Sequence, residues 1–292
     1  MAEFNEAMIQ AIVQQILQQM APSGQGQAAP QEGNDYDGPL MDISDEEVKR
    51  QILVDNPLDP EALAQMRRKT PARIGVGRAG PRLKTRTLLA LRADHAKARD
   101  AVFKDVNPEV LQSLNLFEVK TMCKDRNEHL TRPDLGRKFD PETLNELRSK
   151  CTPSPQVQIY LSDGLSSTAV DANARDILPA LTDGLKGFGI QVGTPFFVKY
   201  GRVPAMDVIG EALDAQVVCV LLGERPGLAT ADSMSAYIAY RPKVGMPEAN
   251  RTVVSNIHKG GIPPVEAGAH VAELIRTILE KKVSGVALQN LK

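Results

Sequence analysis

Val157-Gln-Ile-Tyr-Leu-Ser162 is the first of three short apolar runs that decide the fold, and Val192-Gly-Thr-Pro-Phe-Phe-Val198 and Val217-Val-Cys-Val-Leu-Leu-Gly223 follow it. Apolar runs of this length without polar alternation are typical of strands buried on both faces of a sheet. Helical patterns lie between the runs, at Ala174–Lys186 and Ala205–Leu213, so the strands should be parallel. The sequence therefore predicts an α/β fold in which helices cover both faces of a mostly parallel sheet.

A polar or glycine-rich turn follows each run. The turns are Asp163-Gly-Leu-Ser-Ser167, Tyr200-Gly-Arg-Val203 and Gly223-Glu-Arg-Pro-Gly227. In parallel sheets, ligands bind outside the carboxyl ends of the strands. All three turns should lie at that edge, so the sequence predicts the place of a ligand before its identity.

The first turn contributes four candidate ligand-binding residues, Asp163, Gly164, Leu165 and Ser166. Glycine lets a backbone approach a ligand closely, and hydroxyl and N–H groups at the start of a helix suit phosphate or amide groups. An ordinary strand-to-helix cap explains the same residues equally well. Glu224 follows the third run and has no helix of its own to cap, so it could accept hydrogen bonds from an amide-rich or ribose-bearing ligand.

The α/β region extends over residues 154–292. Ser235–Tyr240 and Thr252–Ile257 are predicted as further strands, and Pro264–Lys282 as a closing helix with one apolar side. Residues 44–153 are predicted to be a helical domain without a convincing strand. Its helix signals are Ser44-Asp-Glu-Glu47, Asp59-Pro-Glu61, Pro81 to about Val106, and Asp140-Pro-Glu142.

Residues 1–20 have apolar side chains at three- and four-residue intervals, the pattern of an amphipathic helix. Residues 21–43 are predicted to be a flexible linker. A short helix on a tether cannot bury its apolar face alone. It should pack on its own domain, or dock on a partner or shell; its polar face has too little Lys and Arg for a membrane surface.

Bulk properties exclude several classes of protein. The formal net charge is −1, and no apolar run approaches the roughly 20 residues that span a bilayer, so neither a nucleic acid nor a membrane is indicated as a partner. The N-terminus lacks the features of a signal peptide. Cys123, Cys151 and Cys219 are too scattered for a disulfide framework or a zinc site, which suits a cytoplasmic protein. The four histidines have no metal-ligand spacing, so no metal site is predicted.

Two features support rival functions. Gly75-Val-Gly-Arg-Ala-Gly80 matches a dinucleotide fingerprint by letter, which would suit a self-sufficient NAD-type oxidoreductase, but no apolar strand precedes it and Pro81 follows it. Residues 67–104 are strongly basic, which would suit a nucleic-acid or other interaction module. Aromatic residues for base stacking are scarce, so a solvated or protein-interface helix is favoured there. A hydrolase is not favoured, because Ser162, Asp163 and His258 lack a nucleophile elbow.

Several long motifs follow one another along the chain: Ala72–Arg82, Ala93-Asp-His95, His129–Arg137, Leu161–Ser166, Val192–Val203, Gly223–Leu228 and Ser255–Gly261. In this order they resemble the small (light) subunit of ethanolamine ammonia-lyase, an adenosylcobalamin-dependent enzyme. The resemblance covers roughly residues 60–282.

This resemblance implies a Rossmann-like domain preceded by a helical part that serves the subunit interface. It implies a larger barrel subunit as partner, which holds ethanolamine and carries out its radical conversion to acetaldehyde and ammonia, with the cobalamin between the two chains. Val203, Glu224 and Val253 fall at the family's cobalamin contacts. Other members carry Cys at the position of Val253, a change that a backbone contact would tolerate. No catalytic residue is expected in this chain.

Two further expectations follow from the resemblance. Many cobalamin domains donate a histidine to cobalt from an Asp-x-His-x-x-Gly turn, whereas Asp163-Gly-Leu-Ser-Ser-Thr168 contains none. Cobalamin should therefore keep its own dimethylbenzimidazole as lower ligand. Residues 1–20 could target the enzyme to the shell of a bacterial microcompartment, where ethanolamine is degraded.

Overall fold

The computed structural model describes residues 42–43, 45, 48 and 50–291. From Ile43 onward the chain forms one compact unit. The helix expected at residues 1–20, nearly all of the linker expected at 21–43, and most of the capping-box segment at Ser44–Glu47 lie outside the described residues.

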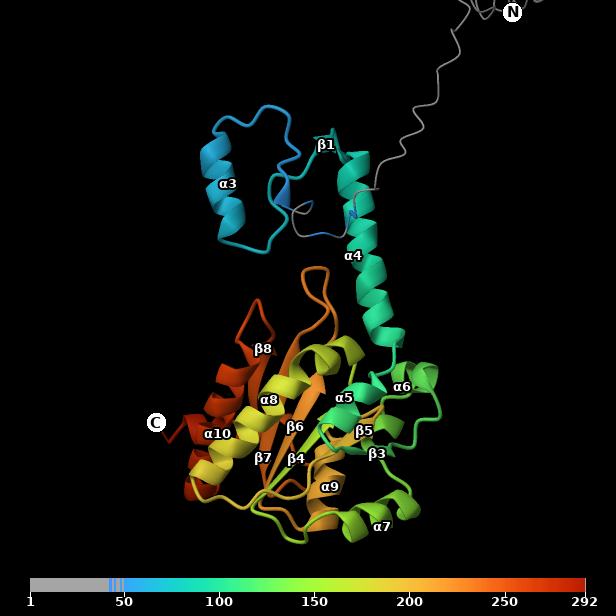
Figure 1. Cartoon of the computed structure of the whole chain (residues 1–292), viewed down its shortest axis with the longest axis vertical. Helices are drawn as coiled ribbons and strands as arrows, with labels where there is room; N and C mark the ends of the chain where they lie inside the picture. The colour runs from blue at the N-terminus through green and yellow to red at the C-terminus, as the bar shows by residue number, and fades with distance from the viewer. Residues whose placement is uncertain (1–41, 44, 46–47, 49, 292) are drawn as a thin grey trace, which may run out of the picture. The chain divides into compact units, whose positions relative to one another are not determined.

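A six-stranded sheet forms the centre of the described structure, with the strand order β3-β5-β4-β6-β7-β8 (Figure 1). Neighbours among β3, β5, β4 and β6 pair in parallel, whereas β7 is antiparallel to both β6 and β8. This confirms the mostly parallel α/β sheet. The strands are β3 (Phe117–Lys120), β4 (Val157–Ser162), β5 (Phe196–Lys199), β6 (Val217–Gly223), β7 (Met234–Tyr240) and β8 (Thr252–Ile257).

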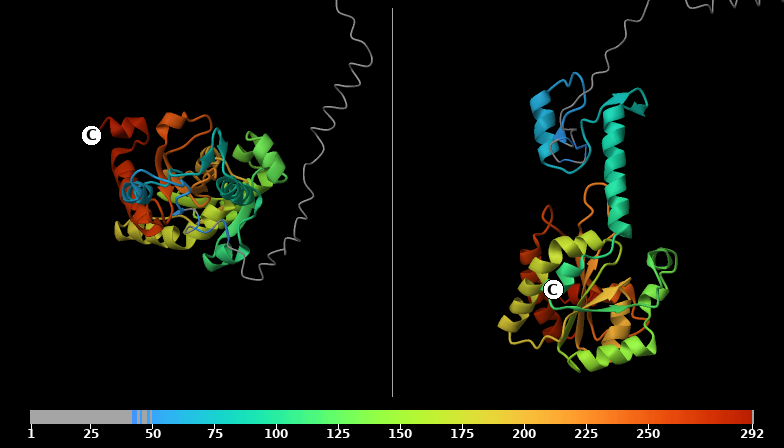
Figure 2. Two further views of the ribbon diagram at one scale, coloured as in Figure 1. Left: turned by 90° about the horizontal axis from the view of Figure 1, so that it is seen from above. Right: turned by 45° about the vertical axis from the view of Figure 1, so that its right-hand side comes forward.

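Every residue of β4 and of β6 is buried, as expected for strands covered on both faces. On one face, α8 (Ser167–Gly187) packs against α10 (Pro264–Lys281), and both lie along the sheet (Figure 2). On the opposite face, α9 (Ala205–Leu213) packs against β6 and against α7 (Pro141–Lys150). Alternate strand residues therefore enter two separate cores.

The second apolar run begins its strand later than the sequence suggests. Val192 makes only an isolated bridge with Val157, and the strand β5 starts at Phe196. Pro195 explains the delay, because it has no backbone N–H to donate to a sheet ladder. The helix Ala205–Leu213, the closing helix, and the strands Ser235–Tyr240 and Thr252–Ile257 are found within one residue of their expected limits. The crossover helix expected at Ala174–Lys186 begins seven residues earlier, at Ser167.

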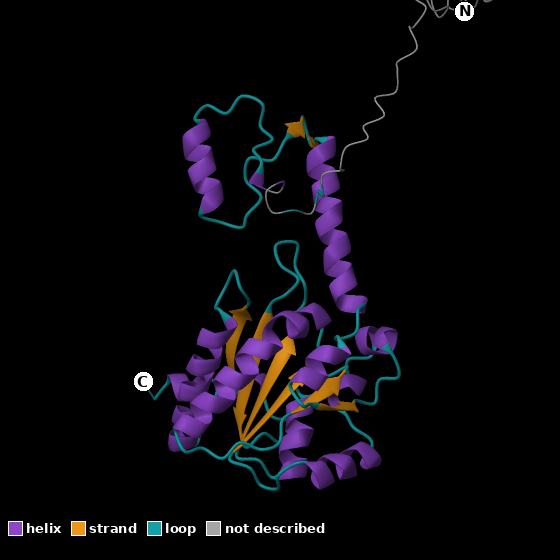
Figure 3. Cartoon of the chain, viewed as in Figure 1, coloured by secondary structure: helices purple, strands orange, loops and turns teal. Residues whose placement is uncertain are grey.

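The expectation of no strand within residues 44–153 is wrong. The edge strand β3 alternates exposed and covered residues, and only Val119 in it is buried, so its apolar signal is too short to detect. A small hairpin, β1 (Arg78–Ala79) with β2 (Arg82–Leu83), also forms. The other elements are helical (Figure 3): α3 (Pro60–Arg68), α4 (Thr85–Phe103), α5 (Pro108–Ser113), α6 (Arg126–Thr131), η1 (Leu135–Arg137), η2 (Glu248–Asn250) and α11 (Val286–Gln289).

The fingerprint-like segment Gly75–Gly80 lies in a loop that enters the β1–β2 hairpin, and Gly80 occupies its turn with φ 58°. It follows no strand and opens no helix, so it lacks the context of a dinucleotide site. Across the described residues, no helix is long and apolar enough to cross a bilayer.

Candidate functional site

The three turns predicted to share one edge of the sheet do so, because β4, β5 and β6 run parallel. The backbone N–H of Tyr200 donates to Asp163 Oδ1 at 2.7 Å, and that of Leu165 donates to the Gly223 carbonyl at 2.9 Å. Gly164 has φ 50°, and a Cβ there would collide with the Gly223 carbonyl oxygen. Only glycine fits this position, so the turns after β4 and β6 can touch.

Asp163 is buried at this edge and forms an ion pair with Arg126 from α6. The Arg126 Nη2 atom lies 2.9 Å from Asp163 Oδ2, and both side chains are more than nine-tenths buried. The guanidinium also stacks over the Tyr200 ring and donates to Ser167 Oγ at 3.2 Å. Burial raises the pKa of Asp163 to about 6, because desolvation of the carboxylate outweighs the favourable charge of Arg126.

His129, also on α6, contacts the same turn. Its Nε2 lies 2.8 Å from the Gly164 carbonyl oxygen, and the side chain is fully buried. Burial lowers the pKa of His129 to about 4, so the ring is neutral near pH 7 and Nε2–H donates to the carbonyl. Arg202 Nη2 donates to the His129 carbonyl at 2.6 Å, which ties α6 to the turn after β5.

Ser166 is buried and acts as the N-cap of α8. Its Oγ accepts from the backbone N–H of Ala169 at 3.2 Å and donates to the Ala231 carbonyl at 2.6 Å. The polar side chains of this turn therefore have partners within the chain. Leu165 is the member of the predicted set whose side chain is half-buried rather than buried.

Glu224 lies just beyond β6, on the side of the sheet that α9 covers. The Tyr237 hydroxyl donates to Glu224 Oε1 at 2.7 Å, while Oε2 has no hydrogen-bond partner among the described residues. Tyr237 is directly opposite Val253 in the β7–β8 ladder, so their side chains lie on the same side of the sheet. Val253 is 45% exposed, and Val203 packs partly buried against the same core as Tyr237.

A buried ion pair links the segments that carry Val203 and Val253. Arg251, just before β8, donates through Nη2 to both carboxylate oxygens of Asp207 in α9, at 2.9 and 2.7 Å. Both side chains are almost fully buried. Val203 lies two residues before the start of α9, and Val253 is the second residue of β8, so the ion pair joins the two segments that carry them.

The structure thus separates the predicted site residues into two groups. Asp163, Gly164 and Ser166 are enclosed, whereas Val203, Glu224 and Val253 border a partly open surface on the α9 side. Sequence reasoning gave no role to Arg126, His129 or Tyr237. Of these, only His129 fell within a motif that carried the resemblance, His129–Arg137.

A family model for the ethanolamine ammonia-lyase light chain matches residues 60–289. The chain belongs to this family. The Clostridium perfringens ethanolamine ammonia-lyase small subunit is 55% identical over 98% of this chain and all of its own length. The small subunit of Clostridium tetani is 59% identical over 87% of this chain and 86% of its own, and that of Clostridioides difficile is 52% identical over 98% and 100%.

Membership of the ethanolamine ammonia-lyase light-chain family makes this chain a subunit of a lyase, and a small subunit implies a hetero-oligomer with a large one. The described residues contain no group of three or more side chains that could hold a metal ion. Of the two histidines at the carboxyl edge, His129 donates from Nε2 to Gly164, and its buried Nδ1 has no hydrogen-bond partner among the described residues. The nitrogens of His258 lie near Asn256 Oδ1 and the Gly260 N–H at 2.9 and 3.1 Å.

Proposed function

We propose that this light chain binds adenosylcobalamin together with the large subunit, in the enzyme that converts ethanolamine to acetaldehyde and ammonia during ethanolamine breakdown. Family membership supports the assignment of this chain to that enzyme, and one local observation supports its proposed role in binding the cofactor. Tyr237 holds one oxygen of Glu224 while the other oxygen remains available, beside the exposed Val253.

The residues on the α9 side of the sheet fit such a cofactor chemically. A corrin is broad and largely apolar, carries amide side chains, and is joined to a nucleotide with ribose hydroxyls. Val203 and Val253 offer apolar contact, and the half-buried Glu224 carboxylate would accept a hydrogen bond from an amide N–H or a ribose hydroxyl. Tyr237 fixes the direction of that carboxylate.

The turn after β4 would serve the same site in a different way. Asp163, Gly164 and Ser166 hold its shape through their internal contacts, and Leu165 would present its half-buried side chain toward the ligand edge. We propose that these residues support the lower face of the cofactor and that none of them contacts ethanolamine.

Bound adenosylcobalamin supplies homolytic cleavage of its cobalt–carbon bond, which is chemistry that no protein side chain provides. The residues of this chain position and shield the cofactor, and the groups that bind ethanolamine are expected on the large subunit. Because His129 is fully buried and both nitrogens of His258 have partners, we propose that dimethylbenzimidazole remains the lower ligand of cobalt.

We also propose that the enzyme works in the cytoplasm, inside a bacterial microcompartment, and that residues 1–20 target it to the shell of that compartment. The amphipathic sequence pattern of residues 1–20 and the polar segment after it support this part of the proposal.

Reconstitution tests the proposal. This chain and the large subunit would be purified separately and mixed with adenosylcobalamin and ethanolamine, and ammonia release would be followed. Release should require both chains. Replacement of Glu224 by Gln should weaken cobalamin binding by about tenfold, the usual range for losing a charge-assisted hydrogen bond.

The exposed Glu280→Gln on α10 is the matched control, and it should bind cobalamin like the unaltered pair. Full cobalamin affinity in Glu224→Gln would remove Glu224 from the site. No ammonia release from a folded, assembled pair would overturn the proposed reaction.

A further inference from the structure

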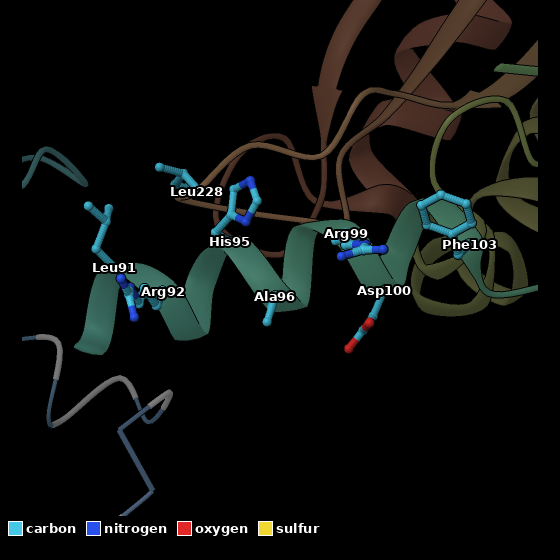
Figure 4. Close-up of a pocket in the computed structure, with 8 residues that line it drawn as sticks. All are labelled: Leu91, Arg92, His95, Ala96, Arg99, Asp100, Phe103 and Leu228. Atoms are coloured by element: carbon cyan, nitrogen blue, oxygen red, sulfur yellow. The ribbon is translucent and has the colours of Figure 1, made fainter. Parts of the chain in front are cut away.

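An open cavity of about 760 Å³ runs along α4, outside the proposed cofactor site. Arg92, His95, Arg99 and Phe103 of α4 line it, and Leu228 from the β6–β7 loop lines it too (Figure 4). In Figure 4, His95 and Leu228 lie on the same side of the helix. We call this feature the α4 groove.

The α4 groove is basic, and its charges are available. Arg92 and Arg99 are exposed, and within the described part of the chain neither forms an ion pair. The guanidinium of Arg99 lies only over the Phe103 ring, 5.7 Å from its centroid. Asp100 is the single acidic residue that lines the groove. A segment with carboxylates would therefore meet a complementary surface.

Apolar side chains are exposed at and beside the α4 groove. Phe103 is 48% exposed and Leu228 40%, and on the same helix Leu89 is 45% exposed. These groups are spaced along α4 and the facing loop, with charged residues between them, and exposed apolar groups with charged neighbours are typical of protein interfaces.

The segment before α4 is also poorly covered by other described parts of the chain. Helix α3 has no buried residue, Leu58 beside it is fully exposed, and Met66 within it is 53% exposed. A nine-residue helix is not stable without packing of its apolar side. The surface around α3 and α4 therefore has the properties of one that is covered in an assembled protein.

We infer that the α4 groove is the docking surface for a segment of the large subunit that combines acidic side chains with an apolar anchor. The apolar anchor would pack against Leu228, with a further contact to Phe103 at the other end of the groove, and the carboxylates would pair with Arg92 and Arg99. The inference rests on the assembly with a large subunit, and it does not depend on how cobalamin binds. A protein is favoured over a nucleic acid because, among the described residues that line the groove, Phe103 is the single Phe, Tyr or Trp, and leucines are exposed around it.

The test is a charge reversal, Arg92→Glu with Arg99→Glu, measured as binding to the purified large subunit without cobalamin. Lys97→Glu is the matched control, because Lys97 is exposed on the same helix but does not line the groove. The double variant should bind the large subunit at least about tenfold more weakly, and the control should stay within about twofold of the unaltered chain. Circular dichroism checks that each variant is folded.

Salt dependence gives a second readout. Binding of the unaltered chain should weaken as salt rises from about 50 to about 300 mM, and binding of Arg92→Gln with Arg99→Gln should respond less. Leu228→Asp tests the apolar anchor and should weaken binding by a similar factor without touching α4. These variants keep the test decisive if the charge reversal disturbs folding.

Equal binding by the unaltered chain and the folded double variant would overturn the inference, as would equal losses in the double variant and Lys97→Glu. Tight binding of a DNA duplex that depends on Arg92 and Arg99, with no effect of either on subunit assembly, would overturn it in favour of a nucleic-acid partner. If assembly depends on these arginines but the pair fails to bind cobalamin, the inference stands and the proposed cofactor role fails.

Discussion

Arg126 of α6 forms a buried ion pair with Asp163 at the end of β4, with 2.9 Å between Nη2 and Oδ2. The two residues come from different parts of the chain, since α6 precedes the first central strand. The pair occupies the carboxyl edge beside β4 and β5, where successive connections leave for opposite faces of the sheet. In many α/β proteins this position is the ligand crevice. Here side chains of the protein fill it.

Replacing Asp163 by Asn should destabilise the chain strongly. Arg126 would keep its burial but lose its buried counter-charge, and breaking such a pair typically costs about 3 kcal/mol or more. Urea unfolding at pH 7 measures the change. Asp183→Asn, at an exposed position of α8, should alter the free energy of unfolding by less than about 0.5 kcal/mol. A loss below about 1 kcal/mol in Asp163→Asn would show that the pair contributes little.

Asp163 and His129 should oppose each other in the pH dependence of stability. The pKa of Asp163 is raised to about 6, so between about pH 4 and 6 the folded state binds more protons there than the unfolded chain. This contribution makes the free energy of unfolding fall as the pH rises. The pKa of His129 is lowered to about 4 from 6.5, so its contribution rises through the same window.

These opposing contributions to the pH dependence of stability can be tested in Asp163→Asn. In this variant the contribution of His129 remains and the contribution of Asp163 is removed. The free energy of unfolding should rise between about pH 4 and 6.5 more steeply in this variant than in the unaltered chain. Urea titrations at several pH values give the two slopes. Parallel curves would mean that Asp163 titrates near its ordinary pKa, because the His129 contribution is common to both proteins.

Gly164→Ala should be among the most damaging single-atom additions in the chain. The residue has φ 50°, and the new Cβ would meet the Gly223 carbonyl, so backbone strain and a steric clash act together. We expect a loss of at least about 2 kcal/mol in the free energy of unfolding. Gly187→Ala is the control: it lies in the last turn of α8, with open space around it, and should be neutral or slightly stabilising. Similar effects of both substitutions would argue against the close approach of the two turns.

Spin resonance of the cob(II)alamin form tests the proposed lower ligand. With nitrogen-15 protein and unlabelled cofactor, the nitrogen splitting on cobalt should match that of unlabelled enzyme, because dimethylbenzimidazole supplies the nitrogen. Labelling the cofactor instead should change the splitting. A change caused by protein label would identify a histidine ligand and contradict the proposal.

Deleting residues 1–20 tests their proposed role in targeting the enzyme to the microcompartment shell. The truncated chain, with the large subunit, should retain ammonia release because the residues proposed to bind the cofactor lie in the α/β region. Fluorescence microscopy in cells with the microcompartment should show that co-localisation with the shell is lost. Retained co-localisation would assign those residues another role.

The central sheet was predictable because its signal is local. Strands β4 and β6 are buried on both faces, so their sequences are continuous apolar runs, and the order of strands and helices then favours a parallel sheet. Strand β3 was not predictable in this way. It lies at the sheet edge, only Val119 is buried, and its position depends on pairing with β5, almost 80 residues later in the chain.

The candidate site, like the sheet, was predictable only where its signal is local in the sequence. The turns predict its edge, and Glu224 stands out in the sequence because no helix directly follows it. The partner of Glu224, Tyr237, is opposite Val220 only once β6 and β7 have paired. Arg126 and His129 lie on a six-residue helix, and their contacts with Asp163 and Gly164 span more than 30 residues. No local pattern encodes such contacts.

The bidentate pair between Arg251 and Asp207 has a consequence for the energetics of ligand capture. It holds the start of β8 against α9, and so fixes the spacing between Val203 and Val253 before any ligand arrives. The loss of conformational entropy at these positions is then incurred during folding of the chain, and association with a large, rigid macrocycle need not order them again. Preorganisation of this kind favours slow release, which would suit the proposed role of this subunit in holding a cofactor.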